Sequence, residues 1–180
     1  QIPPKGLANL RELAIWNFKE ADLGFLSGFP SLEVLDISDA KNLVSTKGIE
    51  RSGGLVELGL LYCPKLQDID GLRALTNLKK LELVNVKRIG DCSSIEGVRF
   101  LERLVIEKAA PIADLKLVAR LKELKSLVVR SAPVADHDLS PLKELPLLEH
   151  IFLDNKKEYE PVHKELKALV AGRKAERLHI

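Results

Sequence analysis

The chain has 180 residues, 46% of them hydrophobic and 30% charged, with a formal net charge of +2. This length suits one domain with a sizeable core, and the near balance of 28 basic and 26 acidic residues does not call for nucleic acid or an anionic membrane as partner. Two cysteines are too few for a disulfide framework or a four-ligand zinc site, and no apolar run reaches the roughly 18 residues that a membrane helix needs.

Apolar residues recur along the chain in the pattern apolar-x-x-apolar-x-apolar. The copies start near residues 10, 32, 55, 78, 101, 124, 148 and 175. The alternation within each copy predicts a short strand with one buried face and one free face. A second apolar pair, such as Leu72 and Leu75, follows several strands, and its spacing indicates one short helical turn on the opposite side. One copy cannot bury both sets of side chains, so we expect neighbouring copies to stack around a continuous core.

This pattern resembles the leucine-rich repeat family, whose repeats of about 20–29 residues follow L-x-x-L-x-L-x-x-N/C-x-L. The resemblance runs from about Leu7 to Ile180, and the segment Asp138-Leu139-Ser140-Pro141-Leu142 looks like an outer turn of short-repeat, internalin-like bacterial proteins. The chain departs from the family at the Asn position, where only Cys63 fits the rule. The residues at that position are Phe18, Ala40, Cys63, Val86, Ala109, Ala132 and Lys156.

The resemblance implies an α/β fold, a right-handed horseshoe-shaped solenoid in a single domain over residues 1–180. About eight short parallel strands are expected on the concave face and short helical or 3-10 turns on the convex side. The chain begins with Gln1 rather than Met and has no evident N-terminal cap, from which we expect a fragment of a longer protein.

One polar position repeats throughout the outer turns. One interpretation is a carboxylate ladder that binds cations. The presence of serine in the column, and the short turn that follows each member, favour side chains that accept hydrogen bonds from backbone N–H groups. We therefore predict structural turn caps and no metal site at Asp22, Ser45, Asp68, Asp91, Asp114 and Asp138.

The last connection, residues 156–174, is longer than the others. Val162, Leu166, Leu169 and Val170 follow helical spacing within it. We predict a helix from about Pro161 to Ala171, ended by Gly172, which would cover the outer side of the last repeats.

No combination of residues predicts catalysis, which needs a nucleophile, a base and an orienting group that meet in space. The common phosphate-binding, hydrolase and metalloprotease motifs are missing from the sequence. Of the four histidines, His150 alone lies on a free strand face well inside the array. We expect no enzyme and no cofactor, and we keep a site near His150 and Asp154 as a third hypothesis.

The free strand face is the candidate functional surface. We expect the third, fifth, seventh and eighth positions of each copy to project from it. Large apolar residues there, including the single Trp, mark a recognition surface, although scattered surface hydrophobes and the strand preference of Val and Phe are an alternative explanation. The predicted partner contacts are Trp16, Asp36, Leu61, Tyr62, Glu82, Val84, Val105, Glu107, Val128, Arg130 and Phe152.

The charges on this face change along the array, from acidic in the first three repeats to basic in the next three, an asymmetry that orients a partner. The first hypothesis is a non-catalytic module that binds a protein partner through the concave face. The second is a sensor or substrate-docking arm of a larger multidomain protein of the ligase, kinase or nucleotide-switch type. We expect neither nucleic acid nor membrane as partner and favour a monomer. Free thiols and the missing signal sequence favour the cytoplasm.

Overall fold

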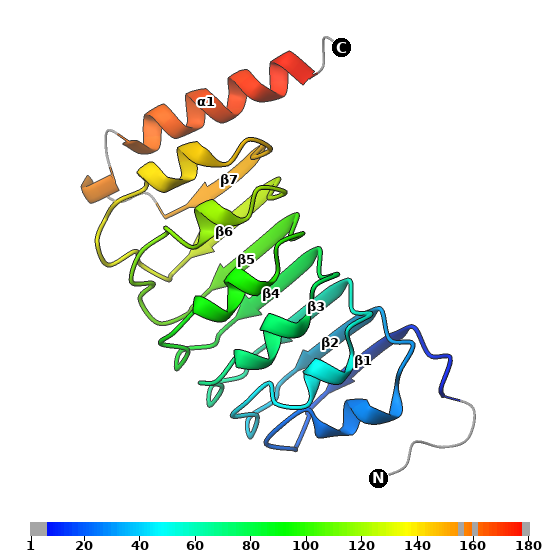
Figure 1. The fold of residues 1–180 in the computed structure, drawn as a ribbon. Helices are drawn as coiled ribbons and strands as arrows, with labels where there is room; N and C mark the ends of the chain where they lie inside the picture. Colours follow the sequence, from blue (N-terminus) through cyan, green and yellow to red (C-terminus); the bar gives the residue numbers. More distant parts are fainter. Residues whose placement is uncertain (1–6, 155–156, 160–161, 178–180) are drawn as a thin grey trace.

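The computed structural model describes residues 7–154, 157–159 and 162–177, which form one stack of repeats (Figure 1). Within these residues, seven parallel strands follow one another in sequence order in a single open sheet. The strands are β1 Glu12–Trp16, β2 Val34–Ser38, β3 Glu57–Leu61, β4 Lys80–Val84, β5 Arg103–Glu107, β6 Ser126–Arg130 and β7 His150–Leu153. The predicted leucine-rich repeat solenoid is confirmed.

Each strand buries one of its two faces. In β2, Leu35 and Ile37 are 0% exposed, whereas Val34, Asp36 and Ser38 lie on the other side. The register brings equivalent residues of neighbouring repeats side by side, so columns of leucine and isoleucine run through the whole stack. This shared core explains why one repeat has little stability without its neighbours.

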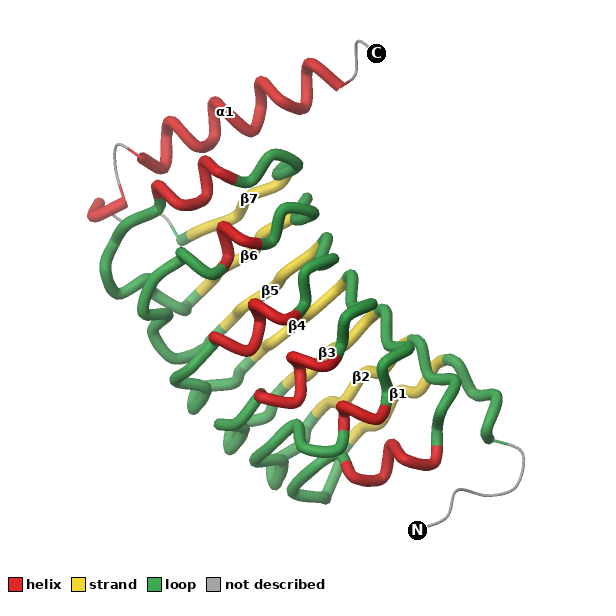
Figure 2. The backbone as a smooth tube through the Cα atoms, viewed as in Figure 1, coloured by secondary structure: helices red, strands yellow, loops and turns green. Residues whose placement is uncertain are grey.

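The return segments contain short 3-10 helices on the side opposite the strands (Figure 2). A second set of buried residues, such as Leu72 and Leu75, comes from these segments and closes the core. The helices are η1 Gly24–Gly28, η2 Ile49–Arg51, η3 Asp70–Ala74, η4 Ser93–Gly97, η5 Val118–Arg120, η6 Ser140–Glu144 and η7 Lys157–Tyr159.

Backbone hydrogen bonds also link neighbouring repeats in the turns that follow the strands. The N–H groups of Val44 and Ser45 both donate to the carbonyl of Ala21, at 2.9 and 3.2 Å. The next repeat repeats this pattern, because Gln67 and Asp68 donate to the carbonyl of Val44 at 3.1 and 3.2 Å. Most of the residues at the position that the family gives to Asn are apolar and buried.

The C-terminal part of the stack differs from the prediction in two ways. Helix α1 spans Val162–Arg177 and packs on η6 and β7, so it does not end at Gly172. Strong helix formers on both sides of Gly172 outweigh the roughly 1 kcal/mol that a glycine costs in a helix. The prediction that an eighth copy of the repeat starts at Ala175 is also wrong, because Ala175 lies in α1. Pro161, Leu178 and Ile180 lie outside the described residues.

No helix in the part of the chain that the structure describes is both long and apolar enough to cross a membrane.

Candidate functional site

The repeated polar column has one geometry at all six positions. Each side-chain oxygen accepts a hydrogen bond, at 2.7–3.0 Å, from the backbone N–H two residues later. Asp68 also accepts the hydroxyl of Ser45 at 2.6 Å, and this bond, with that from the Asp70 N–H, holds the pKa of Asp68 below its ordinary value. These oxygens are used by the turns that begin the outer segments. The residues of the column are Asp22, Ser45, Asp68, Asp91, Asp114 and Asp138.

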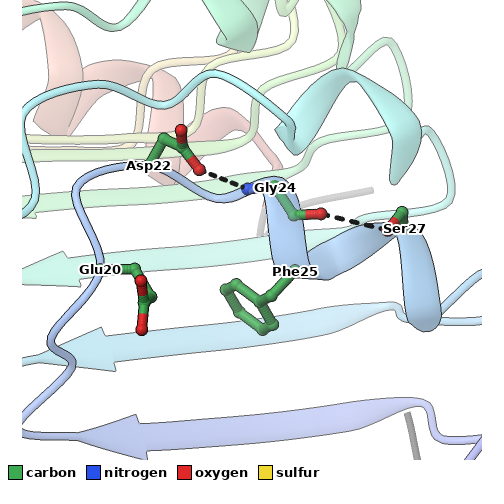
Figure 3. Close-up of a pocket in the computed structure, with 5 residues that line it drawn as sticks. All are labelled: Glu20, Asp22, Gly24, Phe25 and Ser27. Atoms are coloured by element: carbon green, nitrogen blue, oxygen red, sulfur yellow. Dashed lines mark hydrogen bonds between the residues drawn. The ribbon is translucent and has the colours of Figure 1, made fainter. Parts of the chain in front are cut away.

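A hollow at the first outer turn is built from the same kind of turn. Figure 3 shows that the carboxylate of Asp22 points at the N–H of Gly24, and that the hydroxyl of Ser27 points at the Gly24 carbonyl. Glu20 and Phe25 line the rest of the hollow. The Asp22 carboxylate and the Ser27 hydroxyl thus both bind the backbone of the turn at Gly24.

His150 and Asp154 do not meet. His150 is exposed at the start of β7, and Asp154 follows the end of that strand, so four residues of extended chain separate them by roughly 13 Å. One oxygen of Asp154 accepts the N–H of Ser131 at 2.7 Å. Asp154 therefore closes the turn after β6, and the structure gives no support to an acid–base pair with His150.

The two thiols are also unsuited to nucleophilic chemistry. Burial raises the pKa of Cys63 to about 12 and that of Cys92 to about 11. A thiol must ionise to act as a nucleophile. Both cysteines therefore stay protonated near neutral pH and pack as small apolar residues.

The side of the sheet that faces away from the 3-10 helices, here called the open face, consists of three rows of side chains. Strand register defines the rows. The first row is Glu12, Val34, Glu57, Lys80, Arg103, Ser126 and His150; the middle row is Ala14, Asp36, Gly59, Glu82, Val105, Val128 and Phe152; the last row is Trp16, Ser38, Leu61, Val84, Glu107 and Arg130.

Ion pairs link the centre of the open face across three strands. Lys80 lies 3.4 Å from Glu57 and 3.5 Å from Glu82, while Arg103 lies 3.6 Å from Glu82 and donates to the Ser126 hydroxyl at 3.0 Å. Glu82, which the sequence predicts as a partner contact, is thus already bound by two cations of its own chain. Solvent-exposed pairs of this kind contribute roughly 0–1 kcal/mol each, so a partner displaces them at little cost.

Glu107 and Arg130, two more predicted contacts, bind each other. Their side chains approach to 2.5 Å, and the side chain of Glu107 is 16% exposed, against 51% for Arg130. Arg130 is the accessible member of the pair. A partner carboxylate that contacts Arg130 therefore competes with Glu107.

Asp36 has no such partner. Among the residues that the structure describes, no ion pair or hydrogen bond involves its carboxylate, and Lys80 acts on it only at longer range. Partial burial, with repulsion from Glu82 and Glu57, raises the pKa of Asp36. The carboxylate leans over Gly59 on β3, where a Cβ atom would collide with its Oδ1. The glycine therefore makes room for this charge on the open face.

Several large apolar side chains are exposed on this face. Trp16 is 79% exposed and Phe152 is 52% exposed, and Phe152 lines a shallow hollow over β5 to β7 together with Val128. Leu61 and Val84, neighbours in the last row, are partly exposed. The prediction for Val105 is wrong as to its exposure. It is only 7% exposed, since Glu82 and Val128 flank it on the adjacent strands.

In the first six copies the eighth position does not lie on the strand, from which it was predicted to project. It follows the strand end and takes the left-handed backbone conformation, with φ between 51° and 60°. Asn and Asp tolerate this conformation best among residues with side chains, and their recurrence at this position was the signal that the prediction missed. The residues are Asn17, Asp39, Tyr62, Asn85, Lys108 and Ser131.

Tyr62 is the one aromatic residue among these left-handed positions. The φ of Tyr62 is 57°, and the residue is 53% exposed. A bulky residue in the left-handed region lowers the stability of the fold by roughly 1 kcal/mol or more. We expect Tyr62→Asn to raise the free energy of unfolding by about 1 kcal/mol, because strain is relieved and little packing is lost. Urea unfolding followed by circular dichroism measures the change.

Lys108→Asn is the matched control, since Lys108 has a φ of 51° and is also exposed. It should stabilise the fold by a similar amount. A loss of stability in Tyr62→Asn, with a gain in Lys108→Asn, would show that the Tyr62 ring is held for packing and would contradict the expectation.

Comparison with known proteins gives matches in structure alone. No family model and no curated protein matches the sequence. The chain is similar to an internalin (inlF) from Listeria monocytogenes, with a TM-score of 0.68 and 25% identity over 82% of this chain and 43% of that one. An internalin C2 (inlC2) from the same organism gives 0.64 and 22%, over 87% of this chain and 69% of the other. A leucine-rich repeat protein from Leptospira interrogans gives 0.55 and 19%, over 81% and 43%.

The chain thus spans less than half of the length of two of these three structures. All three come from bacteria, and a bacterial origin of this chain fits them.

Proposed function

We propose that this chain, whose fold is an internalin-like leucine-rich repeat solenoid, is a non-catalytic module that binds a protein partner through its open face. One observation carries the proposal. Leu61 and Val84 lie side by side in the last row of the open face, Tyr62 follows Leu61 at the end of β3, and Trp16 lies two strands away in the same row. Tyr62 and Trp16 are both exposed. The fold does not need apolar residues there, because Ser38 and Glu107 occupy the same row.

The charge of the open face indicates what kind of partner it fits. In the three rows, strands β1 to β4 contribute four acidic side chains, Glu12, Asp36, Glu57 and Glu82, against Lys80 alone. Strands β5 to β7 contribute two basic side chains against one acidic. A partner with apolar contacts and basic side chains over β1 to β4 is complementary to this arrangement, which sets its orientation and its association rate.

The test uses random peptides displayed on phage and selected against the wild-type protein. We expect the enriched peptides to bind at least about tenfold more weakly when Leu61→Glu and Val84→Glu are combined, because the two charges occupy the apolar centre of the surface. Titration by fluorescence anisotropy measures the affinity. Circular dichroism checks that the double variant keeps the fold.

Phe100→Glu is the matched control. Phe100 is also an exposed apolar residue, at 59%, but it lies in the turn before β5 and outside the three rows. This variant should bind the selected peptides as the wild type does. Equal binding by the double variant, or a selection that enriches no peptide, contradicts the proposal.

The second hypothesis, a docking arm of a larger multidomain protein, uses the same surface. The two hypotheses differ in what the surface is attached to. The complete reading frame decides between them, because it shows whether a ligase, kinase or nucleotide-binding domain accompanies these repeats.

A further inference from the structure

Asp36 lies between the small residues Ala14 and Gly59 of the neighbouring strands, and two large side chains occupy the next row of the open face. Trp16 on β1 and Leu61 on β3 stand in the last row on either side of Ser38, which has the smallest side chain of that row. Because neighbouring strands are about 4.8 Å apart, Trp16 and Leu61 start roughly 10 Å from each other. That separation accommodates one side chain between them. We call Trp16, Asp36 and Leu61 the Asp36 patch.

The three members of the Asp36 patch offer different contacts. Trp16 is 79% exposed, so its ring is open to a ligand. Leu61 is partly exposed, and its side chain lies 3.6 Å from the site of a Cβ on Gly59, the glycine over which Asp36 also leans. The Asp36 carboxylate and the Leu61 side chain therefore lie together over Gly59 on β3, and the exposed Trp16 lies on β1, on the other side of β2.

Among the residues that the structure describes, no ion pair neutralises the carboxylate of the Asp36 patch. The nearest cation in the rows is Lys80, which already lies within 3.5 Å of both Glu57 and Glu82. Part of the surface of Asp36 is removed from water, Lys80 attracts its carboxylate from longer range, and the carboxylates of Glu82 and Glu57 repel it. An incoming cation relieves this repulsion. Among the described carboxylates of the open face, Asp36 and Glu12 have no ion pair, and of these two Asp36 is the one that lies beside Leu61 over Gly59.

We propose that the Asp36 patch binds an arginine side chain of the protein partner. The inference rests on the proposed function and names the chemistry that one part of the surface recognises. A guanidinium group donates two parallel hydrogen bonds to a carboxylate, and its flat face stacks on an aromatic ring. Here Asp36 accepts the hydrogen bonds, Trp16 stacks on the guanidinium and Leu61 packs against the methylene groups. Lysine lacks the planar group that makes both contacts at once.

The experiment uses blocked tripeptides and the fluorescence of Trp16, which is the only tryptophan of the chain. The probe is Leu-Arg-Leu, and the neutral comparison is Leu-citrulline-Leu, whose side chain has the shape of arginine without its charge. We expect a saturable change in fluorescence with the arginine peptide and at least about tenfold weaker binding of the citrulline peptide, since a charged hydrogen bond is lost.

Variants then locate the site. Asp36→Asn keeps the size of the side chain and should lower the affinity for the arginine peptide about tenfold. Glu57→Gln removes a charge from the same face that is already paired with Lys80, so it should change the affinity less than about threefold by the same reasoning. Thermal unfolding of each variant, followed by circular dichroism, shows that the fold is kept.

Equal binding of the arginine and citrulline peptides, or an unchanged affinity in Asp36→Asn, overturns the inference. Equal binding of Leu-Lys-Leu overturns the assignment to arginine, because charge alone then explains the contact. If the phage-selected peptides depend on Leu61 and Val84 while the arginine peptide does not bind, this inference fails and the proposed function stands. If those selected peptides are insensitive to both residues, the proposed function fails, whatever the tripeptides show.

Discussion

Gly48→Ala should lower the free energy of unfolding by about 2–5 kcal/mol, although the change adds one methyl group. Gly48 has a φ of +100° at the start of η2, a conformation that residues with a Cβ rarely adopt. A Cβ there would come within 2.6 Å of the backbone of Leu23 and Gly24 in the preceding repeat. Both effects act on backbone atoms, so a change of rotamer cannot relieve them.

Urea unfolding followed by circular dichroism measures this loss, and Gly53→Ala is the matched control. A Cβ on Gly53 meets no atom within 4 Å. The free energy of unfolding of this variant should be unchanged or raised by up to about 1 kcal/mol, because alanine restricts the unfolded chain. Similar stabilities of the two variants would contradict the expectation, because they would mean that Gly48 lies farther from the backbone of Leu23 and Gly24 than in the structure.

Leu60→Ala should cost about 3–5 kcal/mol of stability, whereas Leu61→Ala should cost about 1 kcal/mol or less. The two leucines are adjacent in β3 and point to opposite faces. Leu60 is 0% exposed and lies in register between Ile37 and Leu83, so its truncation leaves a cavity in the shared core. Leu61 lies on the open face, where water fills the space that the side chain leaves.

The same two variants distinguish an effect on stability from an effect on binding. At a temperature where both variants remain folded, Leu61→Ala should bind the phage-selected peptides more weakly than the wild type does. Leu60→Ala should bind them as the wild type does. Urea unfolding and anisotropy titrations measure the two quantities. Comparable losses of stability would mean that the register of β3 differs from the observed one, because a shift by one residue exchanges the two faces.

The candidate site was predictable in part. The row that contains Trp16, Leu61 and Val84 follows from the alternation of a strand, and the structure places all three on the open face. Val105 occupies the same kind of position and is nevertheless buried, at 7%. Its exposure depends on the size and direction of side chains on two neighbouring strands. The pattern of one repeat does not contain that information.

The contacts among charged residues could not be predicted from the sequence, for a similar reason. Glu82 and Asp36 stand in the same row and look equivalent in the sequence. Lys80 and Arg103 bind Glu82, whereas Asp36 has neither a hydrogen bond nor an ion pair in the part of the chain that the structure describes. Which carboxylate remains available to a partner depends on distances between strands 23 residues apart in the chain.

The repeat, the solenoid and the division of each strand into a core face and a free face follow from the spacing and periodicity of apolar residues, which depend on local order alone. The end of α1, the residues that turn the chain in the left-handed conformation and the accessible side chains of the open face do not follow from that spacing. These features depend on contacts between repeats, where Gly48 meets Leu23 and Asp36 leans over Gly59. Such contacts exist only once neighbouring repeats are stacked.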